Sequence, residues 1–214
     1  MPGQYIENLV LPKDSGGGIR VDKDDPTFGW RDITGRIRPD PVGTDSPALT
    51  AFIGNVRAYA YSTSPAAKKL DMEFHMPHDW VPGTDLFLHV HWGHNGTAIS
   101  GSIVFDHSAI YGSRDGVFGA QINPVQTVSG LTIGNTPQFA QRVDEFQLTA
   151  ASPSATQFDT DNITVDGLIL ITMSVTTIPT ISGGGSTNPF VFTCDLHYQS
   201  NNIGTKNSAS PFYT

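Results

Sequence analysis

Seven blocks of the chain alternate apolar and polar residues with a period of two, and clusters of Gly, Pro, Asn and Ser separate them. This alternation is typical of β-strands that bury one face. β-branched and aromatic residues dominate the blocks, and no comparable stretch has the 3.6-residue period of an amphipathic helix. The sequence therefore predicts an all-β fold, an antiparallel β-sandwich that is jelly-roll-like. The expected strands are 56–62, 70–76, 86–92, 102–107, 142–149, 168–176 and 190–198.

The two ends of the chain lack this alternation. The first part contains the run SGGG and several prolines, and the last part is polar and rich in turn-forming residues. We therefore predict an extended N-terminal arm (1–48), a β-sandwich domain (49–198) and a C-terminal tail (199–214). Large aromatic side chains in polar arms suggest anchors that dock on other subunits. The candidate anchors are Phe28, Trp30, Phe212 and Tyr213.

The acidic composition limits the classes of partner. The formal net charge is −8 with only 12 Lys and Arg, so the clustered basic residues that bind phosphates are missing and we expect no nucleic-acid partner. No run approaches 18 apolar residues, and the first residues do not have the pattern of a secretory leader, so we expect no membrane contact. The single cysteine, Cys194, excludes an intrachain disulfide and alternates toward the core face of its strand.

Five of the seven histidines lie in the stretch FHMPHDWVPGTDLFLHVHWGHNG, residues 74–96. In the expected strand 86–92, Leu88 and Val90 point to one face while His89 and His91 point to the other. The apolar side is the core face of the sandwich. Both histidines are therefore predicted to lie on the polar face.

Carboxylates are expected beside these histidines. If strands 70–76 and 86–92 form a hairpin, an even register places Glu73 opposite His89 and Asp71 opposite His91. The polar face would then be charge-paired. In a jelly roll, however, consecutive strands can belong to opposite sheets.

Three uses of the histidines are open at this point. The spacing of Gly83, His89 and His91 reproduces the opening of the cupin motif, in which two histidines bind a metal in the mouth of a β-barrel. The glutamate that should follow is missing, and the possible substitutes are His94, Glu73 and His197. Alternatively, the histidines of symmetry-related copies meet on a three-fold axis. The preferred interpretation is an ordinary polar or interfacial face without a cofactor, which includes His75, His89, His91 and His94.

The sequence contains no assembled catalytic set. A GxSxG nucleophile elbow is missing, and a cysteine that alternates inward is more often an inert core residue than a nucleophile. Trp80 lies in an expected loop, where it is suited to stack on a sugar or to contact another subunit. We therefore expect a protein that is not an enzyme, with a cupin-like metalloenzyme that uses His89 and His91 as an alternative.

Two segments of the chain resemble a family of small virion structural proteins from tailed bacteriophages. They are DMEFHMPHDWVPGTDLFLHVHWGHNG, residues 71–96, and FTCDLHYQSNNIGTKN, residues 192–207. The resemblance rests on the segments PGTDLFLHVHW and DLHYQ, and the N-terminal segment FGWRDITGRIRPDP is compatible with it. Residues 108–163 lie outside it.

The resemblance implies a non-enzymatic β-sandwich subunit, a homotrimer that is assembled into the virion in the host cytoplasm. Its expected role is capsid decoration: a cement protein that clamps neighbouring subunits of the major capsid protein and stabilises the head. A tail or fibre subunit is the alternative within the same family, with other virion subunits as partners.

Overall fold

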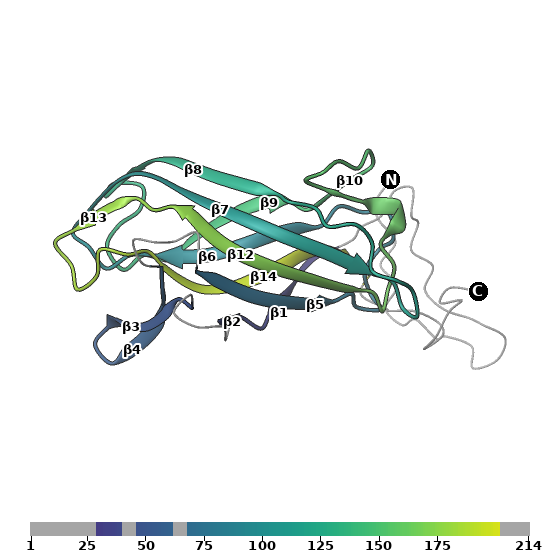
Figure 1. Ribbon diagram of the computed structural model, residues 1–214, viewed down its shortest axis with the longest axis horizontal. Coiled ribbons are helices and arrows are strands. Elements are labelled where there is room, and N and C mark those ends of the chain that lie inside the picture. Colours follow the sequence, from purple (N-terminus) through teal and green to yellow (C-terminus); the bar gives the residue numbers. More distant parts are fainter. Residues whose placement is uncertain (1–28, 40–45, 62–67, 202–214) are drawn as a thin grey trace, which may run out of the picture.

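A computed structural model describes residues 29–39, 46–61 and 68–201 of the chain, and these form two facing antiparallel sheets (Figure 1). The predicted all-β class is confirmed. One sheet contains β1 (Gly29–Gly35), β3 (Ala48–Ile53), β4 (Val56–Ala60), β6 (Phe87–Gly93), β9 (Arg142–Gln147) and β14 (Phe190–Ser200). The other contains β2 (Arg38–Pro39), β5 (Lys69–His75), β7 (Ala98–Gly112), β8 (Val125–Thr132), β12 (Leu168–Thr177) and β13 (Thr180–Ser182).

Eight of these strands follow the order of a jelly roll. The first sheet has the order β1-β14-β6-β9, and the facing sheet has the order β5-β12-β7-β8. The chain therefore passes from one sheet to the other at most of its connections. Near one end of the sandwich, β10 (Thr149–Ala150) pairs in parallel with β11 (Phe158–Asp159), which precedes a single 3₁₀ turn, Thr160–Asn162. Within the described residues, no helix is long and apolar enough to cross a membrane.

Each of the seven predicted strands is present, with shifts at the ends. The largest difference is at 102–107, where the strand β7 extends from Ala98 to Gly112. The sequence pattern missed β1, β3 and β8, because most residues of these strands are exposed on both faces and apolar residues therefore do not alternate.

The described part of the predicted N-terminal arm lies against the sandwich of its own chain. Gly29–Gly35 pairs along its whole length with the last strand, from Gly29 opposite Ser200 to Gly35 opposite Cys194. Arg38 and Pro39 cross to the other sheet and pair with β5. Among the described residues, the sheets therefore already include Gly29–Gly35, ahead of the predicted boundary at residue 49, and β1 takes the position of the first jelly-roll strand. Phe28, Phe212 and Tyr213 lie outside the described residues.

The core lies between the two sheets, and the alternation of side chains identified it correctly. The inward residues Leu88 and Val90 of β6, and Leu70 and Phe74 of β5, are all fully buried. Cys194 is also fully buried, and this burial raises the pKa of its thiol far above the ordinary value. The inert-core prediction for the cysteine is therefore confirmed.

A glycine of β1, Gly35, lies close against the core. A Cβ atom added at Gly35 would lie 2.6 Å from both Cε1 and Cζ of Phe74, whose ring is fully buried in the facing sheet. The ring has no free space into which it can move, since protein cores are close-packed. Only glycine fits between β1 and Phe74 here.

We predict that Gly35→Ala destabilises the protein by about 1–3 kcal/mol, the usual cost of overpacking a core. Urea unfolding at equilibrium measures this change. Gly119→Ala is the matched control, because the nearest atom to its added Cβ, the carbonyl oxygen of Tyr111, is 3.7 Å away. Equal stability of the two variants would show that β1 does not pack on Phe74 as described.

Candidate functional site

A row of polar side chains crosses the outer face of the first sheet. Register places Asp195 of β14 opposite His89 of β6, and His89 in turn opposite Glu145 of β9. Directly opposed residues of antiparallel strands point to the same face. The alternation that buries Leu88 and Val90 therefore also brings one imidazole between two carboxylates.

His89 contacts both of these carboxylates. Its Nε2 atom lies 2.7 Å from Oε2 of Glu145, in hydrogen-bonding geometry. Its Nδ1 atom lies 2.9 Å from Oδ1 of Asp195, but this oxygen is buried and accepts no aligned hydrogen bond from a described residue. The second contact is therefore a close approach rather than a hydrogen bond.

His91, two residues further along β6, contacts the other oxygen of the same aspartate. Its Nε2 atom lies 2.5 Å from Oδ2 of Asp195, and its Nδ1 atom lies 2.6 Å from the side-chain amide of Gln141. The side chains of His89, His91 and Asp195 are only 14%, 16% and 10% exposed. The three groups are thus largely shielded, although they lie on an outer sheet face.

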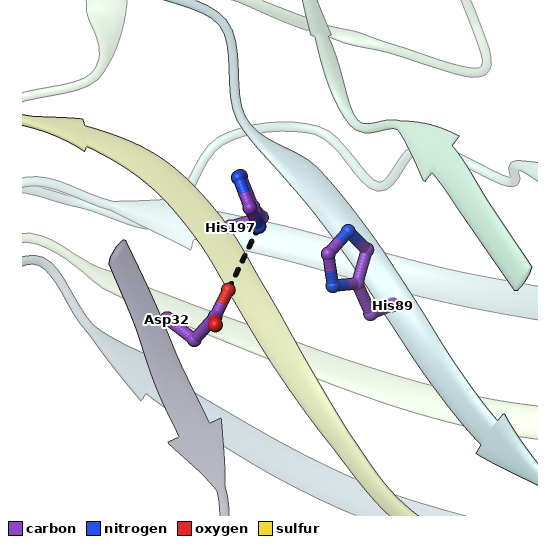
Figure 2. Close-up of side chains that lie close together, drawn as sticks. All are labelled: Asp32, His89 and His197. Carbon is purple, nitrogen blue, oxygen red and sulfur yellow. Dashed lines mark ion pairs between the residues drawn. The ribbon is translucent and has the colours of Figure 1, made fainter. Parts of the chain in front are cut away.

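A second cluster adjoins this one and is shown in Figure 2, where side chains from β1, β14 and β6 converge. Nδ1 of His197 lies 2.8 Å from Oδ1 of Asp32, and the ring centroids of His197 and His89 are 4.7 Å apart. Trp30 also packs on His197, with the two ring centroids 4.7 Å apart. Trp30 is about half exposed and contacts its own sheet, so its predicted role as an anchor on another subunit stays a prediction.

The predicted pairing of the histidines with Glu73 and Asp71 was wrong. β5 and β6 do not form a hairpin but belong to facing sheets. Glu73 instead accepts a hydrogen bond from Arg38, and Asp71 accepts one from Thr172. The expectation of a charge-paired face holds, but its carboxylates come from β9 and β14, which are distant in sequence from β6.

His94 and His75 do not join the cluster. His94 is fully buried: its Nε2 atom contacts the carbonyl oxygen of Thr136 at 2.8 Å, and its Nδ1 atom accepts a hydrogen bond from the backbone of Gly96. Both ring nitrogens are therefore occupied, and His94 is neither an accessible interface residue nor a metal ligand. His75 belongs to the other sheet, where its Nε2 atom lies 3.5 Å from Asp166.

The cupin interpretation placed the histidines in the mouth of a barrel, and the structure corrects this placement. His89 and His91 point away from the core that fills the sandwich. The missing glutamate after His91 nevertheless has a counterpart in space, because Asp195 supplies a carboxylate between the two imidazoles. One ligand atom from each of His89, His91 and Asp195 lies within 4.8 Å of the others, and the same holds for Asp32, His89 and His197.

Sequence reasoning identified the two histidines and noted His197, but it missed Asp195, Glu145 and Asp32. A signal for Asp195 was present: in the segment CDLHY, Asp195 and His197 alternate outward between inward residues. The pairing of β14 with β6 was the information that the sequence lacked.

Other features of the described surface lie away from this cluster. One hollow of about 280 Å³ is lined by residues that include Tyr111, Ile122 and Phe158, and one of about 340 Å³ is lined by residues that include Asp71 and Thr172. Neither contains a histidine. Trp80 is fully buried, so the expected stacking of its ring on a sugar or another subunit is excluded.

The chain matches no protein-family model and no curated protein sequence. Among solved structures, it is similar to the xylan-binding module CBM15, with 8% identity, a TM-score of 0.38, and coverage of 79% of this chain and 97% of the module. The C-terminal family 22 carbohydrate-binding module of Clostridium thermocellum Xyn10B has 11% identity and a TM-score of 0.34, with coverage of 81% of this chain and 87% of that one.

A bacteriophage protein is also among the similar structures. The enzymatically active domain of tailspike protein 4 from bacteriophage CBA120 has 8% identity and a TM-score of 0.27, with coverage of 81% of this chain and 19% of that chain. All three TM-scores are below 0.5. These similarities therefore assign neither a ligand nor a partner to the present chain.

One histidine of β7, His107, lies inside the sandwich and has a structural role. It is 3% exposed, and its ring packs on Phe146 with centroids 4.6 Å apart. Burial lowers the pKa of His107 from 6.5 to about 4, and the backbone of Pro124 offsets only part of this effect. The folded protein therefore holds this imidazole in its neutral form at pH 7.

We predict that His107 makes the protein lose stability as the pH falls from about 6.5 to about 4. In this window the unfolded chain binds a proton at His107 and the folded chain does not, so lower pH favours unfolding by up to about 3 kcal/mol. Urea unfolding of the wild type and of His107→Leu across this range measures the difference. A stability difference between the two proteins that does not change with pH would contradict the prediction.

Proposed function

We propose that this chain is a non-enzymatic structural protein of a tailed-phage virion. Its role is that of a capsid decoration protein, which binds to assembled major capsid protein through the β3–β4 hairpin. The exposed apolar residues of this hairpin carry the proposal. The sequence resemblance to small virion proteins supports the phage context, and the jelly-roll fold suits a rigid structural subunit.

The hairpin projects from the sandwich, as the lower left of Figure 1 shows. Only its base is paired to the rest of the sheet, where Ala60 lies opposite Phe190 and Tyr59 opposite Val191. Towards the tip, Ile53 and Val56 lie opposite one another and are 48% and 68% exposed, and Leu49, nearer the base, is 53% exposed. These side chains do not contribute to the core of their own domain.

The hairpin is fixed to the sandwich by an aromatic cluster around Phe52. The ring centroid of Phe52 lies 5.1 Å from that of Phe190, 4.9 Å from that of Phe192 and 5.7 Å from that of Phe139. The side-chain amide of Asn95 also donates to the backbone carbonyls of Ala51 and Phe52. The hairpin is therefore held in place before any partner arrives.

This combination favours a docking element. Contiguous exposed apolar residues mark interaction sites in soluble proteins. A hairpin that is already ordered loses little conformational entropy on binding, which favours affinity. A decoration protein that binds only the assembled shell stabilises that shell by mass action.

We predict that Ile53→Asp combined with Val56→Asp lowers the affinity for capsids at least about 10-fold, because loss of central apolar contacts costs about 2 kcal/mol or more. Co-sedimentation of the full-length protein with capsids that lack it measures this affinity. Val117→Asp is the control, since Val117 is 90% exposed and lies far from the hairpin, in the loop after β7. All three proteins should unfold at similar urea concentrations.

Cryo-electron microscopy of the decorated particle tests the location directly. Density for the sandwich on the capsid surface, with the hairpin against the shell, is the expected result. Density at the tail would replace the decoration role with that of a tail or fibre subunit. Capsid binding that the double substitution leaves unchanged would contradict the role of the hairpin.

A further inference from the structure

The outer face of the first sheet holds two polar atoms that lie close together without a hydrogen bond between them. Neutral imidazole carries one proton, and the hydrogen bond between Nε2 of His89 and Glu145 places that proton on Nε2. Nδ1 of His89 then carries no proton, and it lies only 2.9 Å from Oδ1 of Asp195. This oxygen is buried and has no aligned donor among the described residues. A cation bound by both atoms would offset the repulsion between them.

We propose that His89, His91 and Asp195 bind one divalent first-row transition metal ion, of which Zn²⁺ is the test case. Two imidazoles and one carboxylate suit such ions, and water would complete the coordination. The site goes beyond the virion role and does not depend on it.

The separation of the ligand atoms fits a metal ion. One atom from each residue lies within 4.8 Å of the other two. Ligands about 2.0–2.1 Å from a tetrahedral Zn²⁺ lie roughly 3.3 Å from each other, so small rotations of the side chains close the site. The backbone already supplies the arrangement, since His89 and His91 share one face of β6 and Asp195 lies opposite His89.

The groups behind the histidines are those that orient metal ligands. Metal-binding histidines usually donate their second ring N–H to a carboxylate or another oxygen, which fixes the ring and makes the ligand nitrogen more basic. Glu145 does this for His89. Gln141 lies 2.6 Å from Nδ1 of His91 and fills the same position there. In the metal-bound form the ring proton of His91 would sit on Nδ1 and donate to the amide oxygen of Gln141, which leaves Nε2 free to bind the ion.

Charge also favours a cation at this position. No Lys or Arg of the described residues forms an ion pair with Asp195 or Glu145, whereas Glu73 and Asp144 have arginine partners. A buried carboxylate is costly unless it is paired. A divalent ion beside Asp195 would supply that compensation.

The neighbouring group of Asp32, His89 and His197 is the weaker candidate. The side chain of Asp32 is 54% exposed, and Nδ1 of His197 already contacts it at 2.8 Å. His89 cannot use Nε2 for this group while that atom donates to Glu145. Asp195 is far more shielded from water, so its group would bind an ion with less competition from solvent.

The test uses the full chain, free of any affinity tag and stripped of metal with a chelator. Calorimetric titration with Zn²⁺ should give one saturable site per chain at micromolar affinity or tighter. Asp195→Asn and His91→Asn should each weaken binding more than about 100-fold, because loss of a second-sphere partner alone costs about 10- to 100-fold. Glu145→Gln removes only such a partner and should weaken binding about 10- to 100-fold.

The second histidine pair of the chain provides a matched control. His75 and His78 both contact Oδ1 of Asp166, but Arg114 lies 2.6 Å from the other oxygen of this aspartate. His75→Asn should leave the Zn²⁺ affinity unchanged. X-ray absorption of the zinc-loaded wild type should show two imidazoles and at least one oxygen in the first shell, which tests the site even if a variant does not fold.

Three results would overturn the proposal. The first is a lack of saturable Zn²⁺ binding by the wild type, which would mean that the three side chains pack together without an ion. The second is undiminished binding by folded Asp195→Asn. The third is a stoichiometry of one ion per two or three chains, which would place the metal between copies.

Discussion

The pairing of β14 holds the first sheet together. This one strand accepts β1 and β4 along one edge and β6 along the other, so three segments from different parts of the sequence depend on it. Its inward residues, such as Leu196, fill the core, and its outward residues Asp195 and His197 form the histidine clusters. The hairpin, the first jelly-roll strand and the candidate metal site are therefore all placed by the same strand.

The local pattern of the sequence was sufficient to predict the strands that are buried on one face. The alternation in β5 and β6 places each inward residue correctly, because burial on one face imposes a period of two. β1 and β3 were not found since their residues are largely exposed and no periodic pattern arises. An edge strand of this kind is recognised only when the strand beside it is known.

The same distinction explains what was found of the candidate site. His89 and His91 were visible as a pair because they are two residues apart on one strand. Their partners were not, since β9 and β14 reach β6 through pairings that span 56 and 104 residues. Glu73 and Asp71, two carboxylates of β5, matched the alternation expected if β5 and β6 formed a hairpin. They do not pair with the histidines because the chain passes to the other sheet between β5 and β6. The short-range alternation of residues does not encode that change.

The fold leaves its only thiol enclosed. Cys194 lies on the core face of β14, opposite Gly35 of β1, with a strongly raised pKa, so reagents that need a thiolate reach it only when the sandwich opens. The rate at which this sulfur reacts therefore reports how often the two sheets separate in the native protein. A bound partner that rigidifies the subunit would slow that reaction without touching the cysteine.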